Sequence, residues 1–143
     1  MNTKYGLICV SKHLQEEDAS LNTFKAMTRK QFAALSSEKG ESEALEVLSN
    51  QVLSNLELTV RILDFCRAND IDHYRLNTSV FGLLADSSFD IDFSNLPNQS
   101  LLSEGIKNIG RTSITKGVSI SIQPDKFCKL IDSDDSIVEK SIK

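Results

Sequence analysis

The sequence is poor in the residues that usually build metal and disulfide sites. It has only two histidines in 143 residues, and its three cysteines, Cys9, Cys66 and Cys128, form no CxxC pair. An odd number of well-separated cysteines argues against both a disulfide framework and a zinc ribbon. We therefore expect reduced thiols in an intracellular protein, two of them in its core.

Long apolar runs and an excess of basic residues are also missing. No segment approaches the roughly 20 apolar residues of a membrane span, and no basic segment followed by an apolar one marks a secretory signal. The formal net charge is −4, whereas broad non-specific nucleic-acid binding needs a basic surface. We expect a soluble protein with one domain over residues 1–143, in which any DNA contact is confined to a local groove.

The most informative stretch of the chain is a long amphipathic pattern followed by a short extended one. Apolar side chains recur in steps of three and four at Leu45, Leu48, Val52, Leu56, Val60 and Leu63. This spacing predicts a helix that packs against a sheet, with Ser42 as its N-cap and its end at residues 68–70. Residues 71–76 then predict a strand, so the two form the αβ half of a βαβ unit.

Other segments extend this alternation in both directions. Residues 4–10 predict a buried parallel strand, and residues 28–35 a short helix capped by Thr28. Residues 98–115 predict a second long helix, with Gly117 at its C-terminal end, and residues 118–122 a third strand. Residues 77–98 show no strong period and predict a long loop, and a further helix is expected to start near Ser133.

The order β-α-β-α-β-α implies parallel strands and an α/β fold. Polar residues gather at the C-terminal ends of the three strands, which is where a (β/α) barrel holds its active site. Three strands leave two open edges, so we expect about the first three units of a TIM-type barrel, with further strands missing. On pattern alone, the interpretation of these strand-end residues as ordinary polar loop residues is favoured.

Two groups of residues resemble the UV damage endonucleases. The first comprises Ser-Asn-Leu-Glu at 54–57, Arg-Ile-Leu-Asp-Phe at 61–65 and Tyr-Arg-Leu-Asn-Thr at 74–78. The second runs from Val118 to Lys143 and contains Gln-Pro-Asp-Lys-Phe at 123–127. The matches occur in the right order almost from Lys4 to Lys143, and they cover about the first half of a typical family member.

The resemblance implies a barrel enzyme that nicks double-stranded DNA beside ultraviolet photoproducts. Family members use divalent metal ions, usually manganese, for phosphodiester hydrolysis, and they flip the lesion out of the stack while a Gln-aromatic pair fills the gap. Carried over by position, the resemblance implies metal ligands at Asp86 and Gln123, where the family has histidines. It implies DNA contacts at Ser11, Arg75, Asn77, Lys126 and Phe127, with Lys126 in place of the family's gap-filling glutamine.

Two alternatives remain open from the sequence. The chain is also interpreted as a catalytically inactive half-barrel that at most binds DNA or a partner chain, since an amide at Gln123 is a weaker ligand than histidine. A different metal-dependent barrel, such as a xylose isomerase-like or apurinic-site endonuclease relative, shares the same architecture. The Tyr-Arg and Pro-Asp-Lys-Phe motifs favour the UV damage endonucleases over this last family.

Overall fold

The computed structural model describes residues 4–8, 16, 23–86, 89 and 91–122. Its sheet contains β1 (Gly6–Ile8), β2 (His73–Leu76) and β3 (Ser119–Ile122), which are parallel and lie in the order β1-β2-β3. Its helices are α2 (Arg29–Lys39), α3 (Glu41–Ala68) and α4 (Gln99–Lys116). The predicted α/β alternation and parallel pairing are confirmed for these residues, while closure into a TIM-type barrel stays a prediction.

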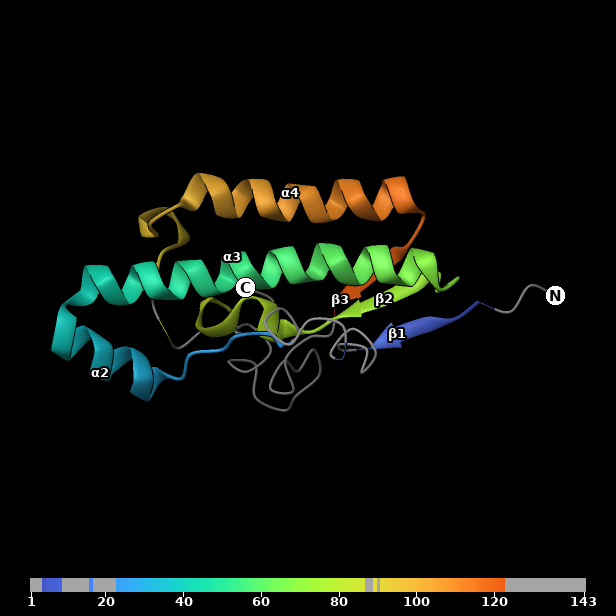
Figure 1. Cartoon of the computed structure of the whole chain (residues 1–143). Coiled ribbons are helices and arrows are strands. Elements are labelled where there is room, and N and C mark those ends of the chain that lie inside the picture. Colours follow the sequence, from blue (N-terminus) through green and yellow to red (C-terminus); the bar gives the residue numbers. More distant parts are fainter. Residues whose placement is uncertain (1–3, 9–15, 17–22, 87–88, 90, 123–143) are drawn as a thin grey trace, which may run out of the picture.

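The long helix α3 is the centre of the arrangement. Figure 1 shows α4 running along one side of α3, while the sheet and α2 lie on its other side, towards opposite ends of the helix. Most of the predicted apolar stripe is buried. Leu48, Val52, Leu56 and Leu63 are almost completely inaccessible, whereas Leu45 and Val60 are partly buried against the core. The stripe is wide because α3 contacts α2, β2 and α4 together.

The start of α3 differs from the prediction. The helix begins at Glu41, so Ser42 lies in its first turn and is not the N-cap. Its cap is Gly40, which also ends α2 and has a φ of 95°, a value that glycine adopts without steric cost. Gly40 therefore joins the two helices directly. Ser42 is already helical, so it lacks the extended backbone that an N-cap residue has.

The short helix predicted after Thr28 is confirmed and is longer than expected. The Thr28 hydroxyl accepts a hydrogen bond from the Gln31 N–H at 3.2 Å, and the Gln31 side chain accepts one from the Thr28 N–H at 2.8 Å. This reciprocal capping box satisfies the free donors of the first turn. The buried Phe32 then attaches α2 to a cluster that contains Met27, Ala44, Leu48 and Leu83.

The first strand is parallel as predicted but is not buried. It forms an edge of the sheet, and Ile8 is 58% exposed. Side chains alternate between the faces of a strand, so Leu7 packs against the main core while Gly6 and Ile8 face away from it. Within the described residues no helix covers that second face, which is why the apolar run does not become a buried strand.

The long connection predicted after β2 contains three short 3-10 turns among its described residues, 77–86, 89 and 91–98. These are η1 (Thr78–Val80), η2 (Gly82–Ala85) and η3 (Phe93–Asn95). Val80, Leu83 and Leu96 are buried and anchor the connection to the body of the protein. The predicted helix that follows is confirmed at Gln99–Lys116, and Gly117 ends it with a left-handed φ of 67°.

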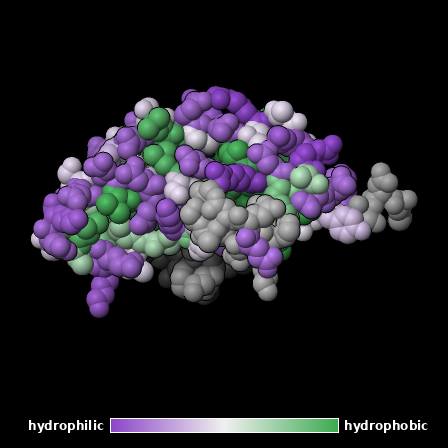
Figure 2. Space-filling view, in the orientation of Figure 1, coloured by the Kyte–Doolittle hydropathy of each residue, from purple (hydrophilic) through white to green (hydrophobic). Residues whose placement is uncertain are grey.

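None of the helices in the described part of the chain combines the length and the apolar character that crossing a lipid bilayer requires. The coloured surface in Figure 2 is mostly hydrophilic, with apolar residues in small separate groups. The predicted helix near Ser133 lies outside the described residues.

Two glycines of α4 offer a matched test of helix packing. A Cβ built on Gly105 would lie 2.9 Å from Cδ1 of the buried Leu56, whereas one built on Gly110 meets nothing within 4 Å. We expect Gly110→Ala to raise the free energy of unfolding by about 0.5–1 kcal/mol through helix propensity. Gly105→Ala should instead lower it by about 1 kcal/mol, because either the buried Leu56 side chain or α4 itself must shift to admit the methyl group. Urea unfolding of both variants measures this difference, and an equal gain in both would contradict the close approach.

Candidate nucleic-acid interface

The C-terminal end of β2 carries the predicted DNA-contacting residues that the structure describes. The strand ends at Leu76, and Asn77 begins the connection. Asn77 Oδ1 accepts a hydrogen bond from the Ser79 N–H at 3.1 Å, and its carbonyl accepts one from the Val80 N–H at 3.2 Å. Its side chain therefore shapes the turn that follows the strand, as asparagine commonly does.

Arg75 lies two residues earlier, on the face of the sheet that points away from the helices. Tyr74 and Leu76 are buried on the helix side, and Arg75 is exposed between them. Its neighbours by strand register are Ile8 on β1 and Ser121 on β3. An exposed guanidinium at a strand end has the chemistry to contact a phosphate.

His73 shares that face and is used for packing. Its two ring nitrogens lie 2.8 Å from the hydroxyls of Ser119 and Ser121. These contacts join β2 to β3 through side chains as well as through the backbone ladder.

A buried asparagine connects α3 to two separate stretches of chain. The Asn55 side chain is only 1% exposed. Its Oδ1 accepts from the Lys25 N–H at 2.7 Å, and its Nδ2 donates to the carbonyls of Lys25 at 2.8 Å, Val80 at 3.0 Å and Ser79 at 3.3 Å. We call this set of hydrogen bonds the Asn55 clamp.

The same two stretches meet again at an ion pair between Arg29 and Asp86. Arg29 Nε donates to Asp86 Oδ2 at 2.8 Å and Nη2 donates to Oδ1 at 2.6 Å. A bidentate pair of this kind fixes the relative orientation of the two side chains in addition to pairing their charges. The pair joins the first turn of α2 to the residue that directly follows η2.

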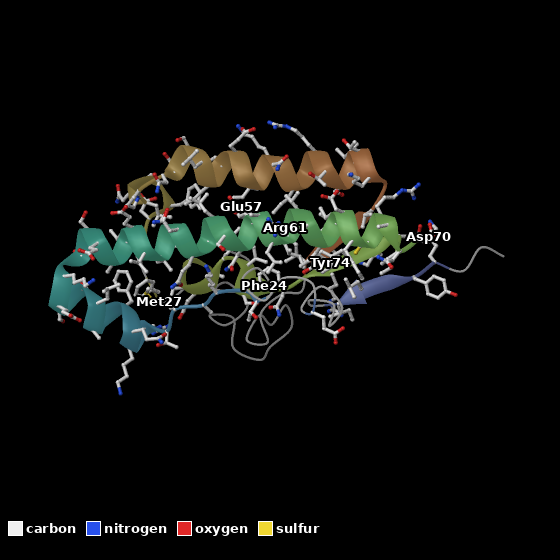
Figure 3. All side chains as sticks on the ribbon, viewed as in Figure 1. Phe24, Met27, Glu57, Arg61, Asp70 and Tyr74 are labelled. Atoms are coloured by element: carbon white, nitrogen blue, oxygen red, sulfur yellow. The ribbon has the colours of Figure 1, made fainter. Side chains whose placement is uncertain are left out.

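Aromatic and apolar side chains support this arrangement from below α3. Figure 3 shows Phe24, Met27 and Tyr74 on the same side of that helix. Phe24 packs against the main core and Met27 belongs to the α2 cluster. The segment between these two anchors contains Lys25, so its backbone is held where Asn55 can reach it.

Three of the seven predicted site residues are therefore placed. Arg75 and Asn77 lie close together at one strand end, and Asp86 directly follows η2, where it is paired with Arg29. Ser11, Gln123, Lys126 and Phe127 fall outside the described residues. The structure does not test the role predicted for any of the seven.

The described residues do not by themselves form a metal centre. Among them, no three histidine, cysteine, aspartate or glutamate side chains are grouped closely enough to hold an ion. Asp86 is a suitable hard oxygen ligand, but its two oxygens are held by the Arg29 guanidinium in this structure. A metal at Asp86 would have to displace Arg29 and recruit ligands from beyond these residues.

Cys66 has no part in such chemistry. It is a free, completely buried thiol, as predicted for a core cysteine, and burial raises its pKa to about 11. At neutral pH it is protonated, and the thiol form is neither a good nucleophile nor a metal ligand. Cys9 and Cys128 lie outside the described residues.

Two structural residues, Asn55 and Arg29, were missed by the sequence-based interpretation. A signal for Asn55 was present, because it is a polar residue within the apolar stripe of a long helix and a buried amide needs partners. Arg29 carries no local signal, because its partner is 57 positions away.

Comparison with known proteins identifies the family. A model of the UV-endonuclease UvdE family matches residues 3–143. The UV DNA damage endonuclease of Nostoc sp. is 28% identical over 138 residues, which are 96% of this chain and 38% of that protein. The UV DNA damage endonuclease of Deinococcus radiodurans is 27% identical over 120 residues, 84% of this chain and 37% of that protein. The chain thus spans less than two fifths of the length of either relative. The family match covers nearly the whole chain and confirms the resemblance, so the protein belongs to the UV-endonuclease UvdE family.

Proposed function

We propose that this protein acts in DNA excision repair, as an endonuclease that nicks double-stranded DNA beside ultraviolet photoproducts. The observation that carries the proposal is the family match over residues 3–143. Both curated relatives are named UV DNA damage endonucleases. The protein would work wherever the DNA is, inside the cell.

We propose that the end of β2 supplies part of the DNA contact. Arg75 is exposed there and can neutralise a phosphate, while Asn77 shapes the adjoining turn. Ser11, Lys126 and Phe127 complete the proposed interface by resemblance to the family. Because the whole chain has a net charge of −4, the contact is local, and its salt dependence should reflect few phosphates.

We further propose divalent metal ions, Mn²⁺ by resemblance, as the cofactor of the hydrolysis, with Asp86 and Gln123 among the ligands. When bound, such ions supply an activated water and stabilise the charge that develops on the phosphate. Since Asp86 is paired with Arg29 and no ligand cluster occurs in the described residues, the proposed centre needs ligands beyond them. Further strands of a TIM-type barrel, which would pair with the open sides of β1 and β3, are the proposed source.

One observation favours a second function, that of a DNA-binding chain without catalysis. The Arg29 guanidinium neutralises the only proposed carboxylate ligand, which suits a structural ion pair as well as it suits a latent metal site. Under this alternative the protein binds irradiated DNA through the same strand end but does not cleave it.

A plasmid assay separates these two functions. We expect the protein to convert irradiated supercoiled plasmid to the nicked form with Mn²⁺, to stop with EDTA, and to leave unirradiated plasmid intact. Arg75→Ala should weaken binding of irradiated duplex and reduce the salt slope by about one, the share of a single phosphate contact. Lys107→Ala, which removes an exposed charge from α4, is the matched control and should change neither. Binding of irradiated duplex without nicking would establish the non-catalytic alternative.

A further inference from the structure

The Asn55 clamp joins two stretches of chain that follow different strands. One is the segment before α2, which contains Lys25 and lies between β1 and α3 in the sequence. The other is η1, which follows β2 and contributes the carbonyls of Ser79 and Val80. Parallel strands point the same way, so the chain leaves each of them at the C-terminal end of the sheet. The two stretches are therefore neighbours at the end where ligands bind α/β folds.

From this geometry we propose that Asn55 is a positioning residue for DNA, which sets the spacing between the two stretches. The proposal rests on the proposed function. Asn55 does not touch the exposed surface, being 1% accessible, so it acts through the residues that it holds. Ser79 and Val80 are the residues whose N–H groups donate to Asn77. The clamp therefore holds the turn that follows Asn77 at the end of β2.

Only an amide side chain matches this set of partners. The partners are the Lys25 N–H, which needs an acceptor, and three carbonyls, which the two N–H groups of Nδ2 reach with one N–H shared between two carbonyls. An asparagine carries both on one planar group. Aspartate lacks the donors and leucine lacks both functions, so either would leave the buried Val80 carbonyl without this partner.

The ion pair between Arg29 and Asp86 joins the same two stretches at a second point. One stretch runs from Lys25 to Arg29 and the other from Val80 to Asp86. The clamp joins Lys25 to Val80 through Asn55, and the ion pair joins Arg29 to Asp86. A single connection would let one stretch rotate against the other. Two connections a few residues apart restrict this rotation. Displacement of about 1 Å at a functional site can cost up to a hundredfold in rate.

Ser49 provides a matched control on the same helix. It is completely buried, and its hydroxyl donates to the Pro97 carbonyl just before α4. Ser49→Ala therefore removes a buried side-chain-to-backbone hydrogen bond from α3 without altering either stretch. A general loss of stability would affect Ser49 and Asn55 variants alike, whereas loss of positioning would appear only at Asn55.

The test combines amide hydrogen exchange with DNA binding on the full chain. Asn55→Ala removes every hydrogen bond of the clamp, and Asn55→Ser, which is small and polar enough to admit water, is the second variant should the first not fold. Circular dichroism sets a temperature at which each variant is folded. Exchange at the Lys25 amide then reports the clamp, and the affinity ratio between irradiated and undamaged duplex reports the DNA site.

We expect the Asn55 variants to lose protection at the Lys25 amide and to bind irradiated duplex about tenfold more weakly, the equivalent of about one hydrogen bond to a phosphate, while Ser49→Ala keeps both properties. Unchanged preference for irradiated duplex in the folded Asn55 variants, or an equal loss in Ser49→Ala, would overturn the positioning role. If the unsubstituted chain shows no preference for irradiated duplex, the proposed function fails and the DNA role of Asn55 fails with it. A loss of Lys25 protection confined to the Asn55 variants would still establish the clamp itself.

Discussion

Replacing Leu102 by alanine is expected to lower the free energy of unfolding by about 3 kcal/mol, the usual cost of a large-to-small change in a core. Leu102 is completely buried in the main core, where α4 packs against α3. The truncation removes the apolar contacts of its side chain and leaves a cavity that two long helices cannot easily close. Urea unfolding followed by circular dichroism measures the change as a lower midpoint.

The neighbouring residue supplies the control for this prediction. Leu101 is 56% exposed on the same turn of α4, so Leu101→Ala makes the same chemical change without opening a cavity. We expect its effect to stay within about 0.5 kcal/mol. Similar losses in the two variants would mean that α4 does not rest on α3 through the Leu102 face.

Replacing Phe32 by alanine should release α2 from the rest of the protein. Phe32 is 8% exposed, and its ring meets that of Phe89 edge-on, with centroids 5.0 Å apart. An isolated helix of eleven residues is marginal in water, so α2 depends on this contact. We expect about 3 kcal/mol to be lost from the local stability of α2, which speeds amide exchange there by about a hundredfold.

The pattern of exchange across the chain tests this prediction. Amides of α3 and α4 should keep their protection, because Phe32 belongs to a cluster separate from the main core. Phe93→Ala, at an exposed phenylalanine of η3, is the control and should leave α2 protected. Equal loss of protection in α2, α3 and α4 would show one cooperative unit instead of a separately attached helix.

The attachment of α2 also bears on the proposed chemistry. Arg29 stands in the first turn of that helix, so release of α2 would withdraw the guanidinium from Asp86. The state of Asp86, paired with arginine or available to a metal ion, is thus linked to how firmly Phe32 holds α2.

Secondary structure and its order were largely predictable from local patterns. The apolar spacing of α3, the capping residue Thr28 and the terminal glycine Gly117 each act over a few neighbouring positions, and each is confirmed. The two errors have a tertiary cause. Ser42 is not a cap because α2 and α3 share Gly40, and the first strand is exposed because its outer face lacks a covering element in the described residues.

The sequence by itself determined the order of strands and helices, the buried stripe of α3 and, through its motifs, the family. Such features depend on periodicity and on short strings of residues, which are properties of the chain before it folds. The tertiary structure alone decided that Arg29 pairs with Asp86, that Asn55 holds Lys25 to Val80, and that Gly105 lets α4 approach Leu56. The partners in the first two contacts are 25 to 57 positions apart, so no local pattern specifies them, and only packing on α3 brings them within hydrogen-bonding distance.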